Sequence, residues 1–206
     1  MRKLLALLAL SVVAAPLASA DQSIAINARG GAAKPWGDSS KGSAMTDSVA
    51  WAFPLQGDLA FRFTKNIGVG AYIRYAPTML ADNLDSACKA AGGSCSATDL
   101  GFGGLVEYRF GERLDGGGWL GLSLGYEMAK TKTAATGGTA TVTLSGFEGG
   151  VQAGYDFTLA ALTIGPFVHA NVGQFSKLEA PGQSGSITDK AFHGFFGLGI
   201  RVGILL

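Results

Sequence analysis

The side chains best suited to chemistry in this sequence are charged residues that recur within otherwise apolar segments. They are Arg29, Arg62, Arg74, Arg109 and Arg201 with Asp58, Asp99, Glu107, Glu127, Glu148 and Asp156. In an extended chain their positions put them on the face opposite the apolar side chains. Opposite charges on one enclosed face must pair, because an isolated buried charge is costly. Two interpretations stay open: a salt-bridged plug, which we expect in a narrow interior, and a path for ions or protons.

His169 and Asn171 stand two residues apart and form a second candidate site. The pair resembles the His-x-Ser pair of the outer-membrane lipid A deacylases, which implies a lipid-modifying enzyme as one alternative. Asn171 has no nucleophilic hydroxyl, and the strand phase turns His169 away from the apolar face unless Pro166 forms a bulge. We therefore expect a hydrogen-bonded packing role for His169, no enzymatic activity and no cofactor.

Cys88 and Cys95 are the two cysteines of the chain and lie seven residues apart in a glycine-containing segment. In an oxidising compartment such a pair forms a disulfide. Metal binding is the alternative, but two thiols without a nearby histidine make a poor site. We predict a local disulfide and no metal.

Alternation of apolar and polar residues predicts the elements that carry these groups. It indicates eight strands, at 23–31, 55–64, 67–75, 99–110, 120–128, 147–157, 162–172 and 192–206. The connections alternate in length, with long ones at 32–48, 76–98, 129–141 and 176–190 and short ones at 65–66, 111–118 and 158–161. This order predicts an all-β, antiparallel up-and-down barrel with long loops at one end and short turns at the other.

Two barrels fit this pattern. A lipocalin-like barrel in water would be apolar inside, whereas a transmembrane barrel would be apolar outside. Aromatic residues near the strand ends on the apolar faces favour the membrane, because they are typical of interface girdles. These residues are Phe63, Tyr75, Phe110, Trp119, Tyr126 and Phe157.

The N-terminus predicts export. Arg2 and Lys3 precede an apolar run at 4–15, and Ala18-Ser19-Ala20 forms a cleavage site before Asp21. We expect a cleaved signal peptide at 1–20 and a barrel domain at 21–206. Loss of the two basic residues changes the formal charge from +1 to about −1, which gives no indication of nucleic-acid binding. Although 48% of the residues are hydrophobic and mean hydropathy is +0.28, residues 21–206 contain no apolar run of membrane-helix length.

The C-terminal segment gives the strongest single pattern. Its apolar side chains alternate with glycines and Arg201 up to the last residue, and they are Phe196, Leu198, Ile200, Val202, Ile204 and Leu206. This strand resembles the closing strand of bacterial outer-membrane β-barrels, which the barrel-assembly machinery reads as a signal, although their usual last residue is aromatic rather than leucine.

The whole pattern resembles the small OmpA-like and OmpX-like barrels. The resemblance implies residence in the bacterial outer membrane, contact with its lipid and lipopolysaccharide, and a structural or surface-interaction role in which the loops bind an extracellular ligand. A narrow channel for small solutes is a further alternative.

Overall fold

The computed structural model describes residues 23–90, 92–110, 116–135, 138–160 and 162–206. The predicted signal peptide lies outside the described residues. The strands are β1 (Ser23–Ser40), β2 (Ser43–Ala44), β3 (Val49–Ala52), β4 (Leu55–Arg62), β5 (Ile67–Leu80), β6 (Ser94–Arg109), β7 (Gly117–Ala135), β8 (Gly138–Leu159), β9 (Leu162–Ala180), β10 (Gln183–Ser186) and β11 (His193–Leu205). Two short helices, η1 (Met45–Asp47) and α2 (Asp82–Ala90), lie between strands. No helix in the described part of the chain has the length and apolarity needed to cross a membrane.

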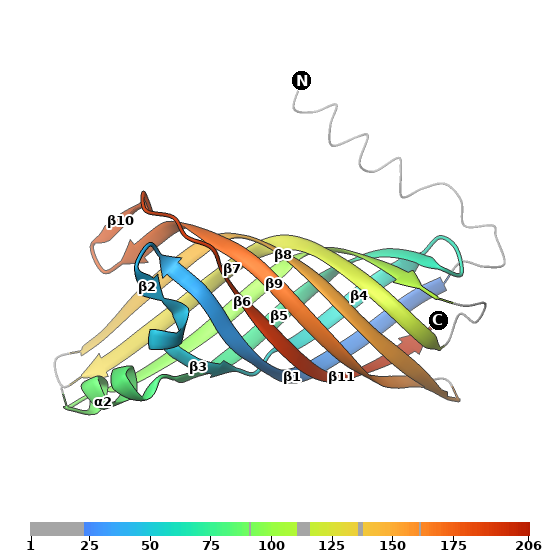
Figure 1. Ribbon diagram of the computed structural model, residues 1–206, viewed down its shortest axis with the longest axis horizontal. Helices are drawn as coiled ribbons and strands as arrows, with labels where there is room; N and C mark the ends of the chain where they lie inside the picture. Colours follow the sequence, from blue (N-terminus) through green and yellow to red (C-terminus); the bar gives the residue numbers. More distant parts are fainter. Residues whose placement is uncertain (1–22, 91, 111–115, 136–137, 161) are drawn as a thin grey trace, which may run out of the picture.

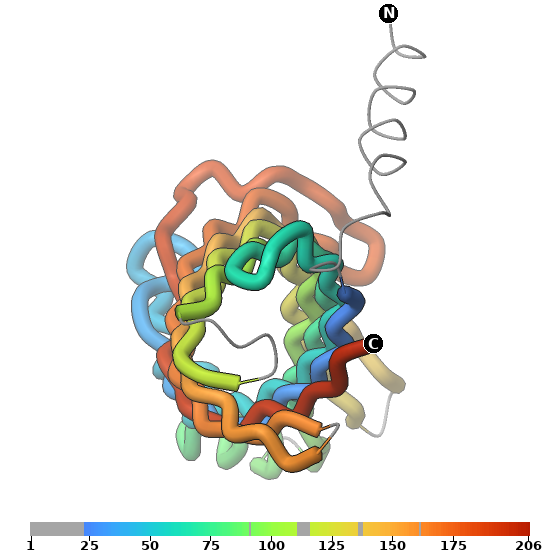
Figure 2. The backbone as a smooth tube through the Cα atoms, turned by 90° about the vertical axis from the view of Figure 1, so that its right-hand side faces the viewer, coloured from blue at the N-terminus to red at the C-terminus, as the bar shows by residue number. Residues whose placement is uncertain are grey.

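Antiparallel pairing closes the sheet into a ring (Figure 2). The wall strands among the described residues are β1, β3 with β4, β5, β6, β7, β8, β9 and β11, which makes eight. The first and last strands close the barrel, since β1 pairs with β11 from Ala25↔Leu205 to Gly37↔His193. The predicted fold class, an eight-stranded antiparallel barrel, is confirmed.

The two ends of the barrel differ (Figure 1). The end that carries β2, α2 and β10, on the left of the view, is here called the loop end, and the end beside the C-terminus is called the turn end. The strands reach further toward the loop end than the sequence predicts. Segment 129–141, predicted as a loop, is largely a ribbon in which β7 and β8 pair as far as Ala135↔Gly138. Segment 176–190 likewise contains the hairpin of β9 and β10, and β1 continues to Ser40.

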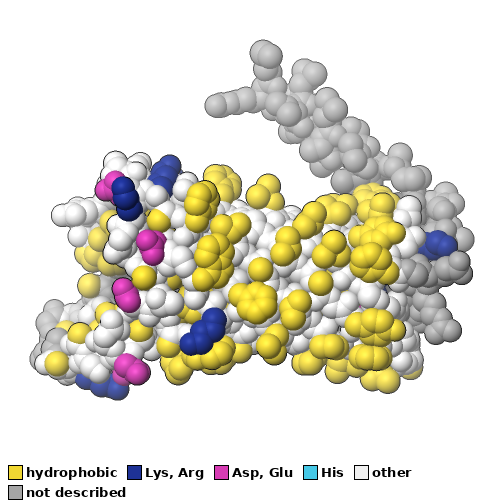
Figure 3. Space-filling model, in the orientation of Figure 1, with side chains coloured by type: hydrophobic (Ala, Val, Ile, Leu, Met, Phe, Trp, Pro, Cys, Tyr) yellow, Lys and Arg dark blue, Asp and Glu magenta, His cyan; other side chains and the backbone are white. Residues whose placement is uncertain are grey.

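An apolar belt surrounds the barrel (Figure 3). Hydrophobic side chains cover the wall in this view, and charged side chains gather mainly at the loop end. Large apolar residues point outward on every wall strand, with exposed fractions of 70% for Leu124 and Phe147 and 60% for Ile73. Proteins in water rarely expose so continuous an apolar surface, and this belt is the surface that a transmembrane barrel presents to lipid.

One side chain assigned to the predicted girdle lies inside the barrel instead. Trp119 is 1% exposed, so the prediction that it faces lipid is wrong. Its indole N–H and its ring both contact charged side chains inside the barrel. Phe63, Tyr75, Phe110 and Phe157 are exposed as predicted, and Tyr126 is half-buried.

Lys34 places a charge on the outer wall. Lys34 is exposed on the part of β1 that was predicted to be a loop, and its Nζ lies 4.5 Å from the centre of the Trp51 ring. An aromatic face stabilises such a cation, and the long aliphatic stem reaches along the apolar surface. Residue 34 was expected in a loop, so the outer wall extends further along β1 than the sequence predicts.

Candidate functional site in the barrel lumen

In the described part of the barrel, buried charged side chains are concentrated on the inner face of the wall, which lines the lumen. Because side chains alternate along each strand, every residue assigned to the charged face points inward. The structure buries the whole set, with exposed fractions of 8% or less. It comprises Arg29, Asp58, Arg62, Arg74, Asp99, Glu107, Arg109, Glu127, Glu148, Asp156 and Arg201. These residues form two layers, one toward each end.

The arginine layer lies toward the turn end and is centred on Glu107. Glu107 Oε1 accepts a hydrogen bond from Arg109 Nε at 2.9 Å, and Oε2 lies 2.7 Å from Arg201 Nη1. Arg29 Nη2 lies 3.7 Å from the same Oε2, and Arg62 Nη2 lies 3.9 Å from Oε1. One carboxylate on β6 thus contacts arginines from four different positions around the wall.

Two further carboxylates complete the arginine layer. Asp58 accepts a hydrogen bond from Arg29 at 2.9 Å, and Asp156 accepts one from Arg109 at 2.7 Å. Side-chain exposure of both carboxylates is 0%, so neither pair is screened by solvent. Removal of one partner from such a pair destabilises the fold strongly, because the remaining charge would be buried alone.

Trp119 joins this layer through both its ring and its N–H. The indole Nε1 donates a hydrogen bond to Asp156 Oδ1 at 3.1 Å. The guanidinium carbons of Arg201 and Arg29 lie 4.4 Å and 4.8 Å from the ring centre. Cation–π attraction to the ring stabilises both guanidinium groups and offsets part of their mutual repulsion. The strand phase predicts this inward position, since the next residue, Leu120, faces outward.

The acidic layer lies toward the loop end and has the opposite balance. Arg74 Nη2 lies 2.9 Å from both Asp99 Oδ2 and Glu148 Oε2. Glu148 also accepts hydrogen bonds from the Tyr72 hydroxyl at 3.1 Å and from Asn171 Nδ2 at 2.9 Å. This layer therefore holds one arginine against several carboxylates.

Glu127 and His193 complete the acidic layer. His193 Nε2 lies 2.6 Å from Glu127 Oε1, and the imidazole stacks on Phe175 with ring centres 3.9 Å apart. His193 is 0% exposed. Sequence reasoning missed its role, although its position in the alternating C-terminal strand shares the phase of Arg201.

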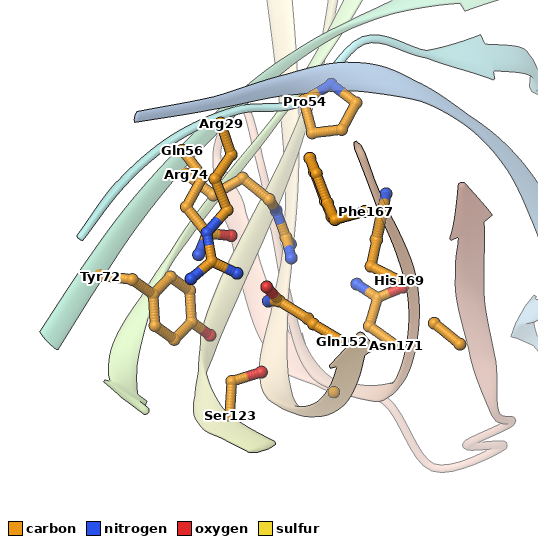
Figure 4. Close-up of a pocket in the computed structure, with 12 residues that line it drawn as sticks. Arg29, Pro54, Gln56, Tyr72, Arg74, Ser123, Gln152, Phe167, His169 and Asn171 are labelled. Atoms are coloured by element: carbon orange, nitrogen blue, oxygen red, sulfur yellow. The ribbon is translucent and has the colours of Figure 1, made fainter. Parts of the chain in front are cut away.

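A small cavity separates the two layers (Figure 4). Arg29, Gln56 and Tyr72 approach it from one side and Phe167, His169 and Asn171 from the other. Its volume is about 20 Å³, which is room for one or two water molecules. His169 Nε2 and Gln152 Oε1 are buried with no protein hydrogen-bond partner, which is the environment that an ordered water occupies.

Pro166 does not reverse the phase of β9. The β8–β9 register keeps the same offset on both sides of the proline, with Phe157↔Ile164 before it and Gly154↔Phe167 after it. His169 therefore points into the lumen, and its ring lies 5.8 Å from that of Phe167. The arrangement that a lipid-facing His169 would need, a bulge at Pro166, is absent from this described strand.

The loop end carries a vestibule above the acidic layer. This cavity has a volume of about 90 Å³, and its lining includes the buried side chains of Asp99 and Glu127. Met45, Phe175 and Phe195 supply apolar parts of the wall. It is larger than the cavity between the two layers.

The helix α2 is fastened beside the loop end by a disulfide between Cys88 and Cys95. Cys95 lies on β6, so the bond ties the helix to a wall strand. On the exposed side of α2, Lys89 Nζ donates to Asp85 at 2.5 Å, and this hydrogen bond raises the pKa of the lysine. Within the described part of the chain, no three potential metal ligands lie together.

No model of a known protein family and no curated protein sequence matches the chain. Similar solved structures include a major outer membrane protein from Thermus thermophilus, with 11% identity over 90% of this chain and 99% of that one and a TM-score of 0.56. OprG from Pseudomonas aeruginosa has 14% identity over 90% of this chain and 97% of its own, with a TM-score of 0.48. Ail, the attachment invasion locus protein of Yersinia pestis, has 14% identity over 88% and 97%, with a TM-score of 0.47.

The similarity to the Thermus protein shows that this chain has the fold of a bacterial outer-membrane β-barrel. The predicted resemblance to small barrels of this class is confirmed. Together with the apolar belt, the fold is that of an integral protein of the bacterial outer membrane.

Proposed function

We propose that this protein is a closed outer-membrane barrel that anchors an interaction surface at its loop end. The observation that supports this role is the filled lumen. Two layers of ion pairs cross the interior, and three cavities that lie between the lumen side chains measure only about 10, 20 and 90 Å³. A solute channel needs a continuous water-filled path, whereas a salt-bridged plug gives a rigid anchor.

The elements beyond the belt supply the surface. The β7–β8 ribbon, the β9–β10 hairpin and the disulfide-tied α2 all lie at the loop end (Figure 1). Exposed Lys132, Lys177 and Glu179 give this end mixed charge. Binding residues are often carried on loops that a rigid scaffold positions, and this barrel provides such a scaffold. Lipid and lipopolysaccharide would surround the belt, and the assembly machinery would read β11 during insertion.

The channel and enzyme alternatives have less support. Arg29, Arg74 and Arg201 lie inside the lumen, and carboxylates already pair with their charges. A lipid-modifying reaction would need its nucleophile and base on the lipid face, but His169 points into the lumen and Asn171 is hydrogen-bonded to Glu148. We therefore propose that the protein is not an enzyme.

Conductance measurements and a binding assay test the two halves of this proposal. In planar bilayers, the refolded barrel should give no regular conductance steps, and stable steps from the wild-type protein would support the channel instead. For the surface, intact barrel and a variant with the β7–β8 ribbon shortened should be compared as bait for envelope and host-surface extracts. Equal capture by both would argue against a role for that ribbon, and release of fatty acid from lipid A would support the enzyme.

A further inference from the structure

The vestibule at the loop end combines an acidic floor with apolar walls. Asp99 and Glu127 line it and are 4% and 1% exposed. Ser48, beside η1 at the loop end, also lines the cavity and is exposed, so the cavity reaches the outside there. A charged group at the floor would therefore be reached from the loop end while remaining shielded from most solvent.

The charge around this floor is unbalanced. Arg74 is shared by Asp99 and Glu148, and Glu127 contacts His193. Even with His193 protonated, the carboxylates of the acidic layer outnumber its cations among the described residues. Excess negative charge in a buried site is costly unless a cation or a proton joins it. The acidic layer is thus arranged to take up one further positive charge, either as a proton or as a bound cation.

One carboxylate in the lining of this cavity has an oxygen without a partner. Asp99 Oδ2 is used by Arg74, but Asp99 Oδ1 is buried and has no hydrogen-bond partner. An unsatisfied carboxylate oxygen in a low-dielectric environment gains strongly from a charged donor. The donor must be small, because Met45, Phe175 and Phe195 narrow the cavity.

The geometry favours a primary ammonium group over a metal ion. In the described part of the chain no three His, Cys, Asp or Glu side chains are placed to share a metal ion, whereas a metal ion needs several oxygen ligands. An ammonium needs fewer oxygen acceptors, and its three N–H donors can be shared between Asp99 and a nearby hydroxyl such as that of Thr78, which lines the same cavity. Apolar walls then accept the attached carbon chain.

We infer that the vestibule is a binding site for a primary alkylammonium group, with Asp99 as its principal acceptor. The group could belong to a free amine or diamine or to a lysine side chain of a protein partner. This inference goes beyond the anchoring role and holds whether or not the surrounding hairpins bind a partner. It requires only the cavity, the charge excess and the free oxygen of Asp99.

Calorimetric titration of the refolded barrel in detergent micelles with propylammonium tests the inference. Binding should be saturable, and tetramethylammonium, which has the charge but no N–H donor, should bind at least about tenfold more weakly. Asp99→Asn should weaken propylammonium binding by about tenfold or more, whereas Asp189→Asn, at an exposed position outside the cavity lining, should leave it unchanged. Saturable binding that is identical in wild type and Asp99→Asn, or no binding by the wild type, would overturn the site.

A second variant keeps the test decisive if Asp99→Asn does not fold. Ala129→Leu adds volume to the vestibule lining without touching a charge and should abolish binding while Arg74 stays paired. Unchanged affinity in Ala129→Leu would place the amine elsewhere and refute the inference. Titration with 1,4-diaminobutane and with a lysine-containing tripeptide distinguishes the two sources of the ammonium group. Tighter Asp99-dependent binding of the diamine would indicate a free diamine, and tighter binding of the tripeptide would indicate a lysine of a protein partner.

Discussion

Arg201 and Glu107 form an ion pair across the full width of the lumen. Arg201 Nη1 lies 2.7 Å from Glu107 Oε2, although three wall strands separate β11 from β6 in either direction around the ring. Side-chain exposure is 0% for the arginine and 6% for the glutamate. Strand pairing cannot make such a contact, so this ion pair stabilises the barrel independently of its backbone ladder.

Glu107→Gln should destabilise the barrel strongly. The substitution keeps the shape of the side chain but removes the charge that Arg29, Arg109 and Arg201 share. Loss of one partner of a buried ion pair costs about 3–5 kcal/mol, and water in the lumen would reduce that figure. Reversible urea unfolding in lipid vesicles measures the change. The exposed Glu179→Gln should stay within about 0.5 kcal/mol of wild type. An equally small effect of Glu107→Gln would show that the arginine layer contributes little.

Brominated lipids should not quench Trp119. Bromine quenches an indole only on close contact, and Trp119 is 1% exposed inside the wall. A variant that retains only this tryptophan, Trp36→Phe with Trp51→Phe, should keep its emission in brominated vesicles. The matched variant that retains only Trp36, which is 41% exposed, should be quenched. Strong quenching of Trp119 would show that its indole faces lipid and would contradict its position inside the barrel.

The sequence predicts the barrel, its strand number and the two faces of each strand because lipid outside and charge inside produce a period of two. Trp119 escaped this reasoning because its type suggests an interface, whereas its phase places it opposite Leu120. Aromatic type therefore proved a weaker guide than phase. The sequence also did not predict the ribbon that β7 and β8 form at the loop end. Strands that pair beyond the membrane need no apolar face, so this ribbon is built from threonine, alanine and lysine and lacks the alternating pattern.

Ion-pair partners could not be read from the sequence for a different reason. Which carboxylate meets Arg201 depends on strand stagger around the closed ring, which the β1–β11 register sets. The sequence offers several acidic residues of the correct phase, and only the three-dimensional register selects Glu107. The vestibule is similarly invisible, because η1 and β9 shape it from distant parts of the chain.

Reduction of the disulfide should loosen α2 without unfolding the barrel. The bond closes a short loop between Cys88 and Cys95, for which the chain-entropy model gives about 2–3 kcal/mol. Only α2 and the start of β6 lie within or beside that loop. Unreduced protein should have a mass lower by two hydrogens than the reduced form, and dithiothreitol should leave the urea midpoint of the barrel unchanged. Two free thiols in unreduced protein would contradict the structure.

Mature protein should begin at Asp21. The arrangement of Arg2, Lys3, the apolar run and Ala18-Ser19-Ala20 predicts cleavage after Ala20. N-terminal sequencing of protein recovered from purified outer membranes checks both the cleavage site and the location. Folded barrel found chiefly in the soluble periplasmic fraction would support the lipocalin-like alternative.

A charge placed on the outer face of the wall, next to the inward-facing Arg201, tests most directly whether the apolar face is the outer one. Ile200 is 50% exposed and Arg201 is 0% exposed, so the barrel wall separates their side chains. Ile200→Arg should lower the free energy of unfolding in vesicles by about 2–4 kcal/mol if the position lies near the bilayer midplane, and by less near the interface. Ile200→Leu should match wild type, because it keeps the apolar surface. A fully stable Ile200→Arg would show that Ile200 does not face lipid, which would contradict the membrane barrel described here.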